Sequence, residues 1–115
     1  MNEKTIKILA NRFMKYFPNY HYIPTFDNFI YYNERIGSFS IDNGSKLTNE
    51  MTIHFPVMLY DEFQNLLSKI ETLYVKEILD LRMQIDVALN WLKDSENIEK
   101  LIQTIKNNKT FQWNE

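Results

Sequence analysis

Residues 35–55, RIGSFSIDNGSKLTNEMTIHF, contain the strongest turn signal in the chain, Asp42-Asn43-Gly44-Ser45. An Asn-Gly pair favours the positive φ that a tight hairpin requires. After this turn, Lys46–Phe55 alternates apolar and polar side chains as a half-buried strand does, and Arg35–Ile41 is expected to form the strand before it. We therefore predict a β-hairpin whose three-residue loop ends at Gly44.

The register of this hairpin follows from its apolar faces, because a slip of one residue turns every side chain to the opposite face. Matching the two faces places Phe39 opposite Leu47. The preceding strand is predicted at Thr25–Tyr32, which is rich in Phe, Ile and Tyr and follows a loop at Pro18–Pro24. The middle of the sequence therefore predicts a three-stranded antiparallel β-meander.

Helices are predicted on both sides of the meander. Apolar residues recur at spacings of three and four in residues 3–17 and again in residues 96–107. Residues 57–93 contain neither Gly nor Pro and also favour helix, either as one long helix or as two with a break near residues 72–74. The expected fold is one α+β domain of 115 residues, with an N-terminal helix, the meander, a long helix and a short C-terminal helix.

The composition excludes several kinds of chemistry. The chain has no Cys, which rules out disulfides and thiolate metal sites and fits a cytoplasmic location. No segment resembles a signal peptide or an apolar membrane span of about 18 residues, so no membrane partner is expected. With 2 Gly in the whole chain, no glycine-rich phosphate-binding loop is present, and we expect no cofactor.

Residues that could bind a metal or catalyse a reaction are scattered along the chain. His21 and His54 are the only histidines, and neither has a companion at a metal-binding spacing. If residues 46–55 form a strand, Glu50 and His54 lie about 13 Å apart and cannot touch. Carboxylates are plentiful, but no motif gathers them. We therefore expect no metal site and a protein that is not an enzyme.

Aromatic residues are concentrated near the N-terminus, where nine of the 17 in the chain lie within residues 13–32. Tyrosine is a favoured interface residue because it is rigid and amphipathic. We predict a contact surface formed by residues 18–24 and the first strand, beside a basic face of the first helix. The expected partner-binding residues are Tyr16, Tyr20, His21, Tyr22, Tyr31, Lys4, Lys7 and Lys15.

A second apolar stripe is predicted in the second half of the long helix, where it runs at four-residue steps beside the main apolar seam. A helix that is apolar on most sides is either buried deep in a core or shared with another chain. We predict a homodimer, with internal burial by residues 96–107 as the alternative. The expected interface residues are Val75, Leu79, Met83, Val87 and Trp91.

The composition also bears on the origin of the gene. Phe, Tyr, Met, Ile, Asn and Lys, which are encoded mostly by A and T, make up 56 of 115 residues. We therefore expect a non-catalytic protein-binding module from a phage or mobile element, which inhibits a host defence protein as an anti-CRISPR protein does. The alternative is a small nucleic-acid-binding protein that uses the basic helix and the tyrosines. The net charge of −2 argues against phosphate binding.

Overall fold

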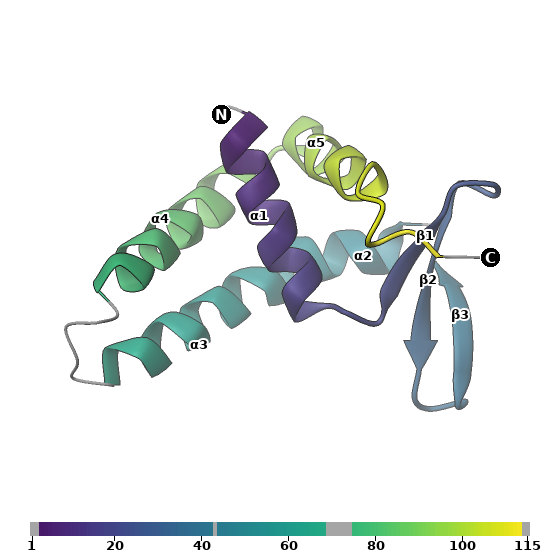
Figure 1. Cartoon of the computed structure of the whole chain (residues 1–115), viewed down its shortest axis with the longest axis horizontal. Coiled ribbons are helices and arrows are strands. Elements are labelled where there is room, and N and C mark those ends of the chain that lie inside the picture. The colour runs from purple at the N-terminus through teal and green to yellow at the C-terminus, as the bar shows by residue number, and fades with distance from the viewer. Residues whose placement is uncertain (1–2, 43, 69–74, 114–115) are drawn as a thin grey trace.

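The computed structural model describes residues 3–42, 44–68 and 75–113. The strands form one antiparallel sheet at one end of the molecule, and the longer helices pack together beside it (Figure 1). The predicted α+β fold is confirmed, with an N-terminal helix, a three-stranded antiparallel sheet and helices after it. The elements in chain order are α1 (Glu3–Tyr16), β1 (Tyr20–Ile23), β2 (Asn28–Asn33), β3 (Ser38–Asp42), α2 (Ser45–Asn49), η1 (Glu50–His54, a π-helix), α3 (Phe55–Ser68), α4 (Val75–Trp91) and α5 (Ser95–Lys106).

The strand predicted at residues 46–55 is wrong, because these residues are helical. α2, η1 and the start of α3 join into one continuous helical run. The error has a simple cause: a step of four residues keeps side chains on one face of a strand and nearly on one face of a helix. Four side chains at this step are completely buried: Leu47, Met51, Phe55 and Leu59. Ile53, which a strand would place on the same face, is exposed.

The helical run begins at a cap supplied by Asp42. Its carboxylate accepts hydrogen bonds from the backbone N–H groups of Gly44 at 2.9 Å, Lys46 at 3.2 Å and Leu47 at 2.8 Å. Gly44 has a φ of +107°, so the positive φ predicted there is present. It leads into a helix instead of a second hairpin strand, and Asn43 lies outside the described residues.

Pro56 lies inside this helical run rather than ending it. A proline in a helix lacks an N–H donor and its ring crowds the carbonyl four residues earlier, here that of Thr52. The wider π-helical turn of η1 spans Glu50–His54 and so includes that carbonyl. We infer that this widening lets the chain continue from η1 into α3 without a break.

With residues 46–55 helical, the sheet still has three strands, because the segment predicted as a loop between Pro18 and Pro24 contains β1. β1 occupies four residues of it, which is too short for a periodic pattern to show in the sequence. β1 pairs with β2, and β2 pairs with β3, in the order β1-β2-β3. Phe39 therefore lies opposite Tyr32 and not opposite Leu47 as predicted.

The segment predicted as one long helix or two forms α3 and α4, which pack against each other (Figure 1). α3 ends at Ser68 and α4 begins at Val75; the break predicted near residues 72–74 lies outside the described residues. α1 packs on α5 and contacts α3. Within residues 3–42, 44–68 and 75–113, no helix combines the length and the apolar character needed to cross a bilayer.

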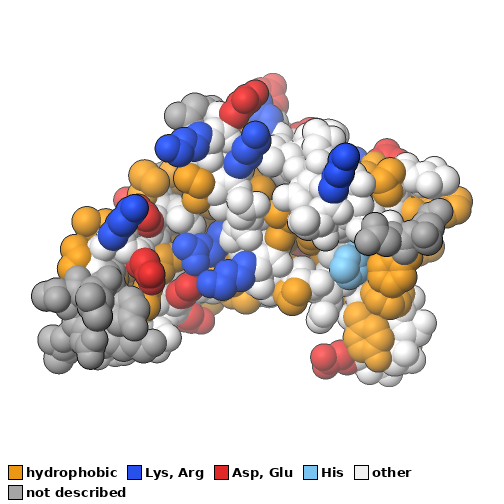
Figure 2. All heavy atoms as spheres, viewed as in Figure 1, with side chains coloured by type: hydrophobic (Ala, Val, Ile, Leu, Met, Phe, Trp, Pro, Cys, Tyr) orange, Lys and Arg blue, Asp and Glu red, His pale blue; other side chains and the backbone are white. Residues whose placement is uncertain are grey.

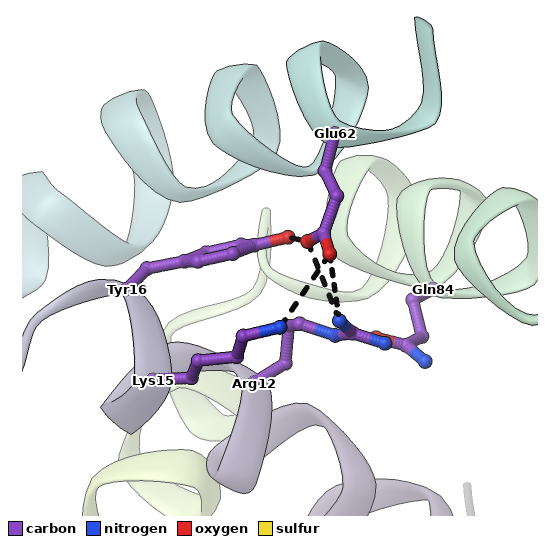
Figure 3. Close-up of polar contacts among 5 residues, drawn as sticks. All are labelled: Arg12, Lys15, Tyr16, Glu62 and Gln84. Carbon is purple, nitrogen blue, oxygen red and sulfur yellow. Dashed lines mark hydrogen bonds and ion pairs between the residues drawn. The ribbon is translucent and has the colours of Figure 1, made fainter. Parts of the chain in front are cut away.

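A cluster of polar side chains links α1 to α3 and α4 through hydrogen bonds and ion pairs (Figure 3). Arg12 Nη1 lies 3.2 Å from Glu62 Oε1, and Arg12 Nε donates to Gln84 Oε1 at 3.2 Å. Lys15 Nζ lies 3.5 Å from Glu62, and the Tyr16 hydroxyl donates a hydrogen bond to the same carboxylate. Burial opposes ionisation of Glu62, but these donors and cations outweigh it and hold its pKa below the usual value.

Stability is expected to fall in acid because Glu62 loses its charge. A carboxyl group whose pKa is lower in the folded protein stabilises the fold above its unfolded pKa, and this contribution disappears as the pH falls through the folded pKa. Thermal unfolding from about pH 7 to about pH 3 measures the loss. Glu62→Gln is expected to be less stable than wild type at neutral pH and to lose less stability in acid. Parallel pH profiles for the two proteins would contradict this role.

Candidate protein-binding surface

The side of the sheet that faces away from the helices is only partly covered by described residues: Ile30 of β2 is buried there, whereas Phe39 and Ile41 of β3 are exposed. Side chains alternate between the two faces of a strand, and the register of the sheet places one set on this side. Trp113, from the segment after α5, lies over the same side. We call this surface the outer sheet face; it consists of His21, Ile30, Tyr32, Phe39, Ile41 and Trp113.

The four rings of the outer sheet face contact one another. The Phe39 ring centroid lies 5.0 Å from that of Trp113 and 5.6 Å from that of Tyr32, both edge to face. The His21 ring lies 5.3 Å from Trp113 in the same geometry. Such contacts add to the stability gained from burying the ring surface, and they hold each ring in a defined position.

Trp113 is held on this face by backbone hydrogen bonds to β1. The Tyr22 N–H donates to the Phe111 carbonyl at 3.1 Å, and the Trp113 N–H donates to the Tyr22 carbonyl at 2.8 Å. Phe111 is buried on the other side of the segment, against Phe29. The C-terminal segment therefore lies along β1 and places an indole ring over the sheet.

The part of the outer sheet face along β3 is open to solvent, whereas Ile30 is buried. Ile41 is 73% exposed, and Tyr32 and Phe39 are each 42% exposed. Figure 2 shows hydrophobic side chains gathered beside a histidine over the sheet, whereas the Lys and Arg side chains visible in that view lie mostly over the helices. A contiguous exposed apolar patch on a folded protein marks an interaction site more often than scattered single residues do.

Two polar residues in the second half of β3 face the interior, the reverse of the usual pattern. Ser40 and Asp42 point inward, and Phe39 and Ile41 point to solvent. The Asp42 carboxylate explains this orientation, because only an inward position lets it cap α2 through three backbone N–H groups. The cap therefore fixes which side of β3 is exposed, and the two apolar side chains stay in solvent as a consequence.

The structure separates the tyrosines that the sequence placed together on a contact surface. Tyr20 and Tyr22 face the helices and are buried, only 4% and 8% exposed. Tyr31 is half-buried and stacks on Tyr20 with ring centroids 5.4 Å apart, and Tyr16 is half-buried at Glu62. Of the five aromatic residues predicted to bind a partner, His21 alone lies on the outer sheet face. We therefore move the proposed contact surface to the opposite side of the sheet.

The Tyr20 hydroxyl is buried without a hydrogen-bond partner among the described residues. Burial and the nearby carboxylates of Glu50 and Asp42 raise its pKa far above the usual value, so it stays protonated. An unsatisfied buried hydroxyl costs stability that a phenyl ring of the same shape does not. Tyr20→Phe is therefore expected to leave the free energy of unfolding unchanged or to raise it by up to about 1 kcal/mol in urea titrations. A loss of more than about 1 kcal/mol would show that the hydroxyl has a partner.

The basic residues predicted at the contact surface lie on α1. Lys4 and Lys7 are exposed and have no ionic partner within the described part of the chain. Lys15 is also exposed but pairs with Glu62, as does Arg12. Figure 1 shows the N-terminal half of α1, which holds Lys4 and Lys7, pointing away from the sheet. The basic face and the outer sheet face are therefore separate surfaces.

The residues predicted to form a dimer interface divide into two groups. Val75, Leu79 and Met83 are exposed on α4. Val87 and Trp91 are half-buried and pack against the core. The predicted homodimer through α4 stays a prediction, and the available apolar stripe is shorter than the sequence suggests.

The two histidines lie in different surroundings from each other. His54 Nδ1 is 2.7 Å from Glu50 Oε1, a contact that a strand forbids and that the helical run permits because these residues are one turn apart. His21 contacts aromatic rings. Across residues 3–42, 44–68 and 75–113, no three His, Cys, Asp or Glu side chains come close enough together to hold a metal ion.

Sequence reasoning missed Phe39, Ile41 and Trp113 as surface residues. The Ser-Phe-Ser-Ile-Asp alternation signals a strand with one apolar side, but it does not show that this side faces solvent. No protein-family model matches the sequence, and comparisons with curated proteins and with solved structures give no significant match.

Proposed function

We propose that this chain is a non-catalytic module that binds another protein through the outer sheet face. The observation that supports this proposal is a sheet surface with four rings that contact one another, of which Tyr32, Phe39 and Trp113 are substantially exposed. Aromatic residues dominate the binding energy of protein interfaces because they bury a large area at a low cost in conformational entropy. The rings here are already held in place, which lowers that cost further.

A protein partner fits this surface better than a nucleic acid does. Proteins that bind single strands combine stacking rings with a positively charged groove along the backbone. The outer sheet face contains no Lys or Arg, and Arg12 and Lys15 on α1 are paired with Glu62. Lys4 and Lys7 belong to the other surface. Nucleic-acid binding is therefore kept as the alternative, to be separated by its salt dependence.

The partner class that the composition favours is a host protein. The excess of residues with A- and T-rich codons and the small size are typical of phage and mobile-element proteins, some of which inhibit host defence enzymes in the manner of anti-CRISPR proteins. Under this proposal the chain acts by occupying a surface of the host protein. The outer sheet face is the part that makes the contact.

The first experiment is affinity capture from cells of the organism that encodes the chain, followed by mass spectrometry. Three baits are compared: wild type, Tyr32→Ala with Phe39→Ala, and Tyr60→Ala. Tyr60 is a matched control because it is an exposed tyrosine that belongs to α3 and not to the sheet. The proposal expects a protein that wild type and the control retain and the double variant loses. Equal capture by all three baits would contradict it.

The nucleic-acid alternative is tested by fluorescence anisotropy with single-stranded DNA and RNA. Binding through Lys4 and Lys7 would weaken steeply as salt rises and would fall with Lys4→Glu and Lys7→Glu. A dissociation constant below about 1 μM at physiological salt, with that behaviour, would replace the protein-binding proposal. The proposal expects no such binding.

A further inference from the structure

The sheet has two edge strands, and described residues cover only one of them. β1 is covered by the C-terminal segment, which forms a parallel bridge between Tyr22 and Gln112. β3 pairs with β2 on one side, and no described residue pairs with its other side. Figure 1 shows β3 at the outer end of the sheet. An open edge offers unpaired backbone groups to another strand.

The hydrogen bonds of β2 show which backbone groups of β3 face the open edge. The Tyr32 N–H donates to the Asn19 carbonyl on the β1 side at 3.2 Å, so Tyr32 is not bonded to Phe39 opposite it. In an antiparallel strand the N–H and C=O of a residue point to the same side and alternate along the chain. Ser40 therefore bonds β2, whereas Phe39 and Ile41 direct their N–H and C=O groups to the open edge.

This edge lacks the features that keep other edge strands from pairing. Ser38–Asp42 contains no Pro and no Lys, and its pairing with β2 is continuous, without a bulge. Its one charge, Asp42, is turned inward to cap α2. The two residues with unpaired backbone groups, Phe39 and Ile41, also expose their side chains. The edge is therefore ready to accept an extended chain.

We propose that two copies of this chain pair antiparallel along β3 and form a continuous six-stranded sheet. In this arrangement Phe39 lies opposite Ile41 of the second copy, and Ser40 lies on the two-fold axis. The four N–H groups that point to the open edges of the two copies then donate hydrogen bonds to the four carbonyl groups that point there. Both outer sheet faces come to lie on the same side, so the partner-binding surface doubles in area. This inference does not depend on the proposed function, because dimers form without the partner.

The pattern of β3 favours a second copy over an unrelated strand. In β3, two residues whose backbone groups point to the open edge are separated by one residue whose backbone groups bond β2. A two-fold rotation brings such a pattern into register with itself, so that each N–H meets a carbonyl group. Shifting the register to place Phe39 opposite itself removes one of the two bonded pairs. The antiparallel direction also keeps the Asp42 carboxylates at opposite ends of the interface, whereas a parallel pairing would bring them together. The edge thus specifies one direction and one register.

The expected dimer is weak. A short strand edge buries less than the roughly 1,200–2,000 Å² of a stable interface, so we expect a dissociation constant on the order of 100 μM. The competing interface is the stripe of Val75, Leu79 and Met83 on α4. The two interfaces can be distinguished by substitution, because pairing along β3 requires backbone N–H and C=O groups, whereas an α4 interface consists of side chains only.

Analytical ultracentrifugation tests this inference with the protein alone, over a concentration range up to about 500 μM. Ile41→Pro removes an N–H that faces the open edge and leaves the bonds to β2 intact, which proline tolerates in an edge strand. It is expected to stay monomeric. Ile41→Thr keeps the N–H, so its dimer dissociation constant is expected to be close to that of wild type. Leu79→Glu with Met83→Glu is expected to dimerise as wild type does.

A covalent trap keeps the inference testable if Ile41→Pro does not fold. The chain has no Cys, so a single introduced thiol can pair only with its copy. Ser40→Cys on the two-fold axis falls at a close, non-hydrogen-bonded pair, where Cα atoms are about 4.5 Å apart and a disulfide fits. Mild oxidation is expected to cross-link Ser40→Cys much faster than Ser38→Cys or Leu79→Cys. Monomeric wild type at the highest concentration, equal cross-linking rates, or a dimer broken only by the α4 substitutions would overturn the inference.

Discussion

Asp42→Ala is expected to lower the free energy of unfolding by about 3 kcal/mol, because it removes a cap and leaves one buried and two partly buried N–H groups without their acceptor. Oδ1 of Asp42 accepts from Gly44 and Lys46, and Oδ2 accepts from Leu47. Asp42→Asn keeps one acceptor oxygen but turns an N–H₂ donor toward the remaining N–H groups, so it is expected to lose an intermediate amount. Urea unfolding followed by circular dichroism measures both variants.

Asp94→Ala is the matched control for the Asp42 substitutions. Asp94 caps α5 with a single hydrogen bond to the Glu96 N–H at 2.9 Å, at an exposed site, and its loss is expected to cost about 1 kcal/mol. If residues 46–55 formed the strand that the sequence suggests, Asp42 would be a turn residue of small effect. A loss at Asp42 no larger than that at Asp94 would therefore contradict the helical run.

The second large effect is expected in binding kinetics. Once capture identifies a partner, Tyr32→Ala with Phe39→Ala is expected to speed its dissociation by at least about 30-fold, which corresponds to about 2 kcal/mol for loss of aromatic hot-spot residues. Lys4→Glu with Lys7→Glu is expected to leave the dissociation rate unchanged and to alter only the association rate, because both lysines lie outside the outer sheet face and act on the partner through long-range steering alone. Surface plasmon resonance separates the two rates.

The Tyr60→Ala variant serves again as the control for these kinetics. Its tyrosine is exposed on α3, so its removal should leave both rate constants unchanged. Each variant is also unfolded in urea, because Tyr32 and Phe39 contact each other and their loss could weaken the sheet. Unchanged dissociation in a folded double variant would contradict a role for the outer sheet face.

The sequence predicted the α+β class and the helices at both ends because their apolar periods are unambiguous. It failed at Leu47, Met51 and Phe55 because a four-residue step satisfies the strand period and the helix period at once. The choice of helix depends on contacts distant in sequence or across a turn, such as the Asp42 cap and the burial of the seam among the other helices. The secondary-structure propensity of a short segment does not include the effect of those contacts.

The candidate surface was harder to predict than the fold. Tyr20 and Tyr22 are suited to an interface by residue type, but they are buried because they lie on the side of β1 that faces the helices. Phe39 and Ile41 look like core residues, but the inward-facing carboxylate of Asp42 turns them to solvent. Residue type predicts the character of a surface, whereas strand register decides which residues form it.

The measurement that tests the central claim most directly is oxidative footprinting of side chains with and without the captured partner. Trp113, Tyr32 and Phe39 are exposed and carry rings that hydroxyl radicals modify readily, and Tyr60 and Met83 report on the helical surface in the same sample. The proposed function predicts strong protection of the first three residues and unchanged oxidation of the other two. Protection of Tyr60 or Met83, with Trp113, Tyr32 and Phe39 oxidised as in the free protein, would contradict it.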